Sequence, residues 1–112
     1  MTSPVLDGAR AASHQRKILR SRAVLHFSNG NIVQARTTDI SVAGLSLLSA
    51  QSLAAGVACH VVFQIAMAGK LHDIAADVEV VYNTCHGTDG FRLGLRFTTL
   101  DPERSRLINR LQ

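Results

Sequence analysis

The sequence predicts a mainly β protein, a six-stranded antiparallel barrel closed by one short C-terminal α-helix. Three observations support this. Apolar and polar residues alternate along several segments, the period expected of strands that bury one face. Short turns join these segments, with no helical pattern between them, which favours an antiparallel over a parallel sheet. An Asp-Pro pair near the C-terminus then opens the one clear helical pattern.

Length and composition predict a single cytoplasmic domain. A chain of 112 residues, 46% of them hydrophobic, is long enough to bury a core without disulfides. It has no apolar run long enough to span a bilayer and no signal peptide, so we expect no membrane insertion. Residues 1–14 are expected to form a flexible leader before a domain at 15–112. Cys59 and Cys85 are expected to be reduced thiols without an assigned role.

The first two expected strands form a hairpin. Residues 22–27 place Ala23, Leu25 and Phe27 on one side of an extended chain. The Asn-Gly pair that follows marks a tight hairpin turn. The return strand is therefore expected at about 32–38.

The middle of the chain is expected to hold one short and two long strands. A third strand should cover 45–49, followed by a loop or single turn at 51–56. The clearest alternation in the chain is at 57–67. A short turn leads into a further strand at about 71–83, whose buried face is expected to carry Ile74, Ala76, Val78, Val80 and Tyr82.

The end of the chain is expected to supply the last strand and the helix. After a loop at 84–90, residues 91–98 alternate Phe and Leu with Arg and Gly. Asp101 can cap a helix whose first residue is Pro102, so a helix is expected over 101–112. Its apolar residues share one face, which is expected to cover an open end of the barrel: Leu107, Ile108 and Leu111.

Two polar segments are the candidate binding elements. In Asp39-Ile40-Ser41-Val42-Ala43-Gly44, an extended chain would point the side chains of Asp39 and Ser41 to one face. Gly44 would allow a positive φ or the close approach of another group. Alone, this hexapeptide also fits an ordinary turn in which Asp or Ser caps its own backbone.

The second segment is basic, with Arg16 and Arg20 inside an expected loop at 15–21. On a helix these arginines would share a face. In an extended loop they could span roughly 13 Å, about the length of a dinucleotide. Without a partner motif, the segment would be read as a solvated basic loop. A guanidinium suits phosphate and the guanine edge, and most basic residues of this chain, whose net charge is +4, are arginine.

Together the two segments resemble the signature of the PilZ domain, the bacterial receptor module for cyclic di-GMP. The likeness consists of Arg-x-x-x-Arg followed about twenty residues later by Asp-x-Ser-x-x-Gly. The run 91–100 and the following Asp-Pro-Glu also look like that family's last strand and closing helix. The resemblance covers roughly 14–112 and implies a PilZ-like split barrel.

The resemblance also implies roles for single residues. Arg16 and Arg20 would take phosphate, the guanine edge and base stacking between them. Asp39 would accept hydrogen bonds from guanine, and Ser41 would add a hydroxyl contact. The implied set is completed by the motif glycine and three possible additions: Gly44, Lys17, Arg22 and Ala43. The pair His14-Gln15 departs from the acidic or basic residues of many relatives, which leaves open whether one ligand molecule or two would bind.

The leading functional hypothesis is a cyclic di-GMP receptor whose loop changes conformation on binding and signals to a downstream protein in motility, exopolysaccharide or virulence control. The alternative is a PilZ-like protein–protein adaptor that does not bind the nucleotide. A nucleic-acid binder is third, because the chain has only five aromatic residues for stacking.

No enzymatic activity, metal or cofactor is expected. The histidines are scattered and neither they nor the cysteines have ligand spacing. Cys85 and its neighbour His86 would point apart in an extended chain, which argues against a nucleophile pair.

Overall fold

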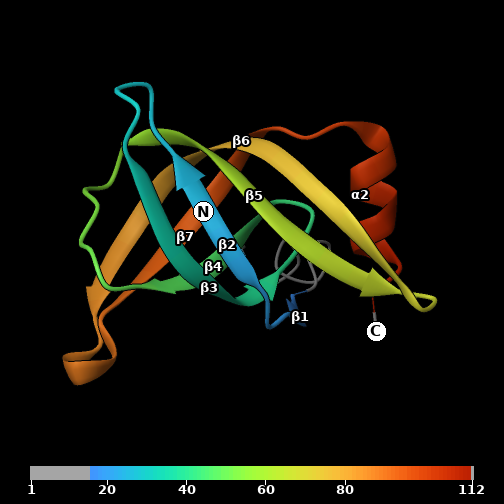
Figure 1. Ribbon diagram of the computed structural model, residues 1–112, viewed down its shortest axis with the longest axis horizontal. Helices are drawn as coiled ribbons and strands as arrows, with labels where there is room; N and C mark the ends of the chain where they lie inside the picture. Colours follow the sequence, from blue (N-terminus) through green and yellow to red (C-terminus); the bar gives the residue numbers. More distant parts are fainter. Residues whose placement is uncertain (1–15, 112) are drawn as a thin grey trace, which may run out of the picture.

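The computed structural model describes residues 16–111, and the expected leader at 1–14 lies outside this range. Its strands are β1 (Lys17–Ile18), β2 (Arg22–His26), β3 (Ile32–Ile40), β4 (Gly44–Ser49), β5 (Ala58–Met67), β6 (Lys70–Cys85) and β7 (Phe91–Thr99), followed by helix α2 (Pro102–Asn109). Figure 1 shows the strands wrapped around one interior with α2 at one end. The predicted all-β fold with a C-terminal helix is confirmed.

The barrel closes through antiparallel pairing alone. The hydrogen-bonded order runs β2–β3–β4–β7–β6–β5 and returns from β5 to β2. The short strand β1 pairs with the end of β3, outside this circuit. The segment expected to be a loop at 15–21 is therefore partly a strand. It pairs with Asp39 and Ile40 of the candidate binding segment. Six strands form the barrel and β1 is an addition to it.

Most strand boundaries agree with the sequence prediction. Two strands run two residues past their expected ends: β3 continues to Ile40, and β6 continues to Cys85 where a loop was expected from residue 84. A 3₁₀ turn at Gly87–Asp89 then leads into β7. The β6 difference arises because Thr84 and Cys85 pair with Arg92 and Phe91 of β7, so these residues stay in the sheet.

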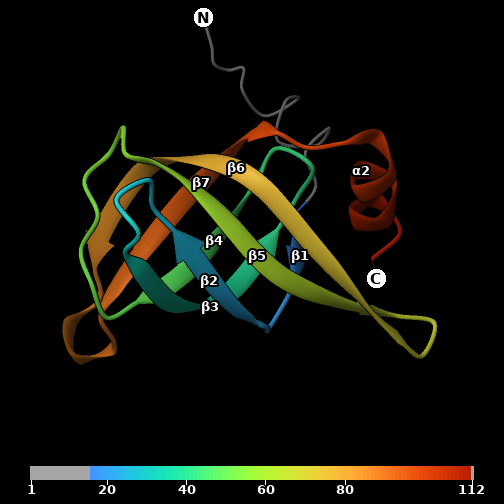
Figure 2. The same ribbon diagram turned by 45° about the horizontal axis from the view of Figure 1, so that its top comes forward.

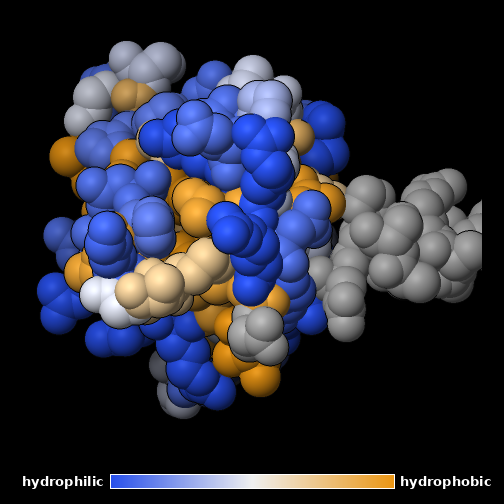
Figure 3. All heavy atoms as spheres, turned by 90° about the vertical axis from the view of Figure 1, so that its right-hand side faces the viewer, coloured by the Kyte–Doolittle hydropathy of each residue, from blue (hydrophilic) through white to orange (hydrophobic). Residues whose placement is uncertain are grey.

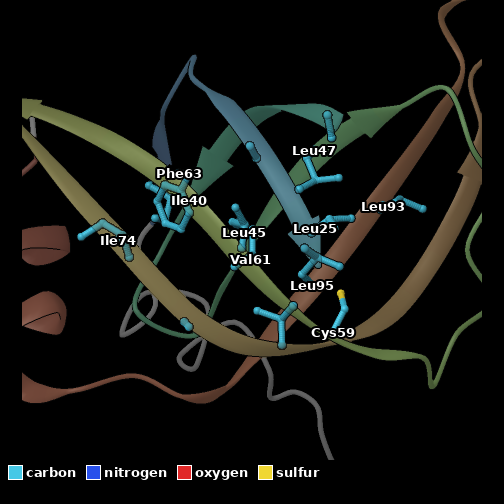
Figure 4. Packing of buried hydrophobic residues seen from close by; sticks show 14 of the residues in the cluster. Leu25, Ile40, Leu45, Leu47, Cys59, Val61, Phe63, Ile74, Leu93 and Leu95 are labelled. Carbon is cyan, nitrogen blue, oxygen red and sulfur yellow. The ribbon is translucent and has the colours of Figure 1, made fainter. Parts of the chain in front are cut away.

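The core lies inside the barrel and follows the predicted alternation (Figure 4). Strand β5 is the most regular example, with Cys59, Val61, Phe63 and Ile65 buried and the residues between them more exposed. Strands on the opposite wall supply Ile40, Leu45, Leu47, Leu93 and Leu95. Each large aliphatic side chain that is fully buried contributes on the order of 1.5 to 3 kcal/mol. The inward residues therefore supply the main stabilisation of the barrel.

Three β-bulges interrupt the strand pairing within residues 16–111. One lies in β7, where Thr98 is extra because Asp77 pairs with Thr99 and Val78 with Phe97. The other two shape the candidate site. In β3, Thr37 pairs with Leu47 but Asp39 pairs with Ser46, so Thr38 is an extra residue. In β6, Val80 pairs with Leu95 but Tyr82 pairs with Gly94, so Val81 is extra. An extra residue reverses the side-chain alternation beyond it. Tyr82 is consequently 41% exposed, and the prediction that it faces the core is wrong.

Helix α2 begins as predicted, with the Asp101 carboxylate accepting a hydrogen bond from the backbone N–H of Arg104 at 2.9 Å. This bond is the main reason why the pKa of Asp101 is lowered. Ile108 is buried in the core cluster, and the helix lies at the end of the barrel near the β5–β6 hairpin in both views (Figures 1 and 2). Within residues 16–111, α2 is too short to cross a membrane, and no longer helix is present.

Candidate functional site

The candidate site is a row of residues across four strands on the outer surface of the barrel. The cross-strand partners are Asp39 on β3, Ser46 on β4, Gly94 on β7 and Tyr82 on β6. We call these four residues the outer row. The two bulges bring it together, because unbroken alternation in β3 and β6 would direct Asp39 and Tyr82 into the barrel.

Asp39 holds two guanidinium groups at one end of the outer row. One carboxylate oxygen accepts from Nε of Arg16 at 2.6 Å, and the other accepts from Nη2 of Arg92 at 3.0 Å. Arg16 also donates from Nη2 to Oγ of Ser46 at 3.3 Å. Charge-assisted hydrogen bonds of this kind are stronger than neutral ones. The carboxylate thus positions both arginines over the same part of the sheet.

Tyr82 lies at the other end of the outer row. A Cβ placed on Gly94 would come within 2.0 Å of the Tyr82 ring, so the absence of a side chain at Gly94 lets the ring lie across β7. The hydroxyl groups of Tyr82 and Ser46 are 3.1 Å apart and hydrogen bonded. Arg16, the outer row and Arg92 line a hollow of about 310 Å³. The site therefore offers two cations, a carboxylate and a partly exposed aromatic ring.

Ser41 does not join the outer row. Its side chain is 1% exposed, and its hydroxyl accepts a hydrogen bond from the backbone N–H of Ala43 at 3.1 Å. The expectation that Ser41 and Asp39 point to one face is wrong, because β3 ends at Ile40 and Ser41 begins the tight turn into β4. Ser41 instead caps the turn, which is the alternative that the hexapeptide at 39–44 offered.

Gly44 allows close packing of the backbone. A Cβ there would lie 1.9 Å from the carbonyl oxygen of Leu95, whereas the φ of Gly44 is not positive. Of the two uses predicted for this glycine, close approach is the one observed. The turn is joined to β7 on its other side, since Ala43 accepts a backbone hydrogen bond from Phe97 at 2.9 Å.

The remaining candidates lie apart from the outer row. Arg20 is exposed and lines a separate hollow with the β5–β6 hairpin and the two residues that follow α2, Arg110 and Leu111. Lys17 donates from Nζ to the carbonyl oxygens of Ile108 and Asn109 in the last turn of α2, at 3.3 and 2.6 Å. Arg22 is exposed on β2 and lines a third hollow. In this structure Arg16 and Asp39 are together, and Arg20 is not with them.

The sequence reading missed Arg92, Ser46 and Tyr82. Arg92 is 53 residues from Asp39 in the chain, so no local spacing links the two. Ser46 follows from the register of β3 and β4 once Asp39 is placed. A Gly between two leucines in β7 was the available signal for Tyr82, since a glycine inside a strand often marks a close approach.

Within residues 16–111, no cluster of three or more His, Cys, Asp or Glu side chains could hold a metal ion. Both cysteines are free thiols, and burial raises the pKa of Cys59. Cys85 is exposed at the far end of β6.

Comparisons with solved structures confirm the barrel architecture. The PilZ domain with c-di-GMP of YcgR from Escherichia coli matches with a TM-score of 0.64 and 16% identity, covering 87% of this chain and 85% of that one. The Bacillus subtilis inhibitor of motility MotI/DgrA matches with a TM-score of 0.75 and 10% identity, covering 85% and 46%. The Borreliella burgdorferi PlzA protein in complex with c-di-GMP matches with a TM-score of 0.60 and 18% identity, covering 94% and 43%.

The chain thus spans less than half the length of MotI and PlzA, and at these identities the likeness is one of fold. A search among curated proteins found no match. The model of the PilZ domain family, however, matches residues 11–111, nearly the whole chain. This chain therefore belongs to the PilZ domain family.

Proposed function

We propose that this protein is a cyclic di-GMP receptor that binds the nucleotide at the outer row and passes the signal to a downstream protein in motility, exopolysaccharide or virulence control. The observation that carries the proposal is the single carboxylate of Asp39 holding Arg16 and Arg92 beside the Tyr82 ring. Two family relatives, YcgR and PlzA, are described as complexes with c-di-GMP, which supports the same ligand here. We infer a binding module rather than an enzyme.

The ligand presents groups that match each part of the site. Its phosphodiesters are anions that a guanidinium can take in two parallel hydrogen bonds. Its guanines carry N1–H and N2–H donors that suit the Asp39 carboxylate, and O6 and N7 acceptors that suit an arginine. In this proposal Arg16 exchanges Asp39 for phosphate, and Asp39 then accepts from a guanine.

Tyr82 is proposed to stack on a guanine. Stacking of a base on an aromatic side chain contributes about 1 to 3 kcal/mol and needs an accessible ring face. Tyr82 meets that need because it is 41% exposed, and because the missing side chain of Gly94 leaves room for the ring to lie against the sheet. Arg92, on the neighbouring strand β7, is proposed as a further contact to the bound nucleotide.

Arg20 enters this site only if its segment moves. The segment carrying Arg16 and Arg20 is held by the short pairing of β1 with β3 and by the Lys17 bonds to α2. Leu19 adds two hydrogen bonds, from its N–H to the carbonyl of Thr38 and from the Thr37 hydroxyl to its carbonyl, and its side chain packs against the core. Movement of Arg20 to the outer row would have to replace contacts of this segment. We propose that cyclic di-GMP draws both arginines to the outer row, and that this movement changes the surface shown to other proteins.

Calorimetry of the purified chain with cyclic di-GMP, with GTP as the control ligand, tests the proposal. A charge-assisted hydrogen bond is worth about 1.5 to 3 kcal/mol, so Arg16→Ala should weaken binding on the order of tenfold to a hundredfold. Arg106→Ala, an exposed arginine on α2, is the matched control and should leave the affinity unchanged. Absence of heat with cyclic di-GMP, or equal affinities for Arg16→Ala and wild type, would contradict the proposal and favour the adaptor without nucleotide.

A further inference from the structure

We propose that the groove beside α2 is a docking site for an acidic, apolar segment of a partner protein. The groove has a volume of about 570 Å³ and lies between the β1–β2 connection, the β5–β6 hairpin and the last residues of the chain. We define the α2 groove by the six lining residues used below: Ile18, Arg20, Met67, Leu71, Arg110 and Leu111. Figure 3 shows this face of the molecule, with apolar atoms visible between hydrophilic side chains.

The apolar part of the α2 groove is unusually exposed. Ile18 is 72% and Leu71 is 67% exposed, the two highest values among the exposed large hydrophobic residues of the described chain. They are 53 residues apart in the sequence, and both line this groove. Met67 and Leu111, which are partly buried against the core, extend the apolar lining. Exposed apolar side chains gathered in one hollow mark an interaction site more often than scattered ones do.

The charge of the α2 groove selects the chemistry of its occupant. Arg20 and Arg110 are both exposed and both line it, and none of the described lining residues is acidic. One carboxylate is close by, that of Asp73, which accepts a hydrogen bond from the lining residue Gln64 at 2.9 Å. Two arginines beside apolar side chains match a segment that carries leucine-like side chains next to Asp or Glu. Such a segment would bury Ile18 and Leu71 and pair with both arginines.

Nucleotide binding at the outer row is expected to change the α2 groove, an inference that rests on the proposed function. The hollow at the outer row and the α2 groove share no lining residue, but Arg16 lines one and Arg20 the other. If cyclic di-GMP draws Arg20 to the outer row, the groove loses one of its two cations. Nucleotide binding should therefore weaken the docking of an acidic segment, which gives the receptor a route to a protein partner.

Selection of short random peptides displayed on phage against the full chain tests the docking site. Enriched peptides are expected to combine Asp or Glu with Leu, Ile or Phe. Synthetic copies should bind the Leu71→Ser and Arg110→Glu variants about tenfold more weakly than wild type. Ile32→Ser is the matched control, because Ile32 is 56% exposed on β3 but does not line the groove, and it should bind as wild type does.

Four outcomes would overturn the docking proposal. They are no enriched acidic and apolar peptide, equal binding by the groove variants and wild type, a concentration-dependent dimer that Leu71→Ser abolishes, and peptide binding only after residues 1–14 are removed. The last two would assign the groove to a second copy or to the chain's own leader. Calorimetry with cyclic di-GMP on Leu71→Ser separates this proposal from the previous one, because that variant should bind nucleotide normally whatever happens to peptide binding.

Discussion

Strands β5 and β6 are the two arms of one hairpin, yet they differ in how their side chains are distributed. In β5 the alternation of buried and exposed residues holds almost throughout, from Cys59 to Ile65. In β6 it holds only to Val80, where the extra residue Val81 turns Tyr82 outward. A bulge in β3 does the same for Asp39. The regular strand contributes to the core along most of its length, whereas the two interrupted strands contribute to the core and also carry residues of the candidate site.

Truncating a core side chain of β5 should have the largest effect on stability. Phe63 on β5 is fully buried, and Phe63→Ala should lower the free energy of unfolding by about 3 to 5 kcal/mol through lost apolar burial and a residual cavity. Urea unfolding followed by circular dichroism measures this change. If the loss stayed below about 1 kcal/mol, the interior would be less tightly packed than the structure indicates.

A substitution in the outer row should affect nucleotide binding more than folding. In Gly94→Ala the new Cβ would meet only the Tyr82 ring among its nearest neighbours, and a side chain can tilt away. Nucleotide affinity should then fall by about tenfold, the equivalent of 1.4 kcal/mol, because the stacking face is lost.

Gly44→Ala is the matched comparison for Gly94→Ala. Its Cβ would meet the backbone carbonyl of Leu95, which cannot move without disturbing β7, so this variant should lose stability instead. Thermal unfolding and calorimetry on both variants would separate the two effects. Equal loss of stability in both would show that Tyr82 is as rigid as the barrel backbone.

The smallest expected effect concerns Asp77 on β6, whose cross-strand partner on β5 is His60. The hydrogen bond from His60, at 3.0 Å, is the main cause of the lowered pKa of Asp77, and Thr99 adds a second. Because the folded state holds the carboxylate ionised more firmly, this contribution to stability is present above 3.8, the ordinary pKa of an aspartate side chain. It is lost as the pH falls through the lower pKa of the folded state.

The Asp77 effect can be measured by thermal unfolding. Asp77→Asn should lose slightly less stability than wild type when the pH is lowered from about 5 to about 2. Because the Asp77 side chain is exposed, salt should reduce the difference further. A larger acid sensitivity in Asp77→Asn than in wild type would contradict this sign.

The regular half of the molecule could be predicted from the sequence, because it depends on local patterns. Alternation located β5, the Asn-Gly pair located the β2–β3 turn, and Asp101 with Pro102 located the start of α2. The site could be predicted only in part. Bulges depend on how two strands pair, so no local pattern revealed that Asp39 and Tyr82 share a face. Arg92 was missed for the same reason, since only the closed barrel brings it to Asp39.

The pairing of Asp39 with two arginines has a consequence for which molecules the empty site admits. A simple anion such as chloride or sulfate that drew one guanidinium away would leave the Asp39 carboxylate with one cation in place of two, and it has no donor to offer that carboxylate in return. A guest that carries an anion and an N–H edge compensates both partners at once. The Asp39 carboxylate thus disfavours small inorganic anions in two ways. It repels them by its charge, and it occupies the guanidinium groups of Arg16 and Arg92 that would bind them.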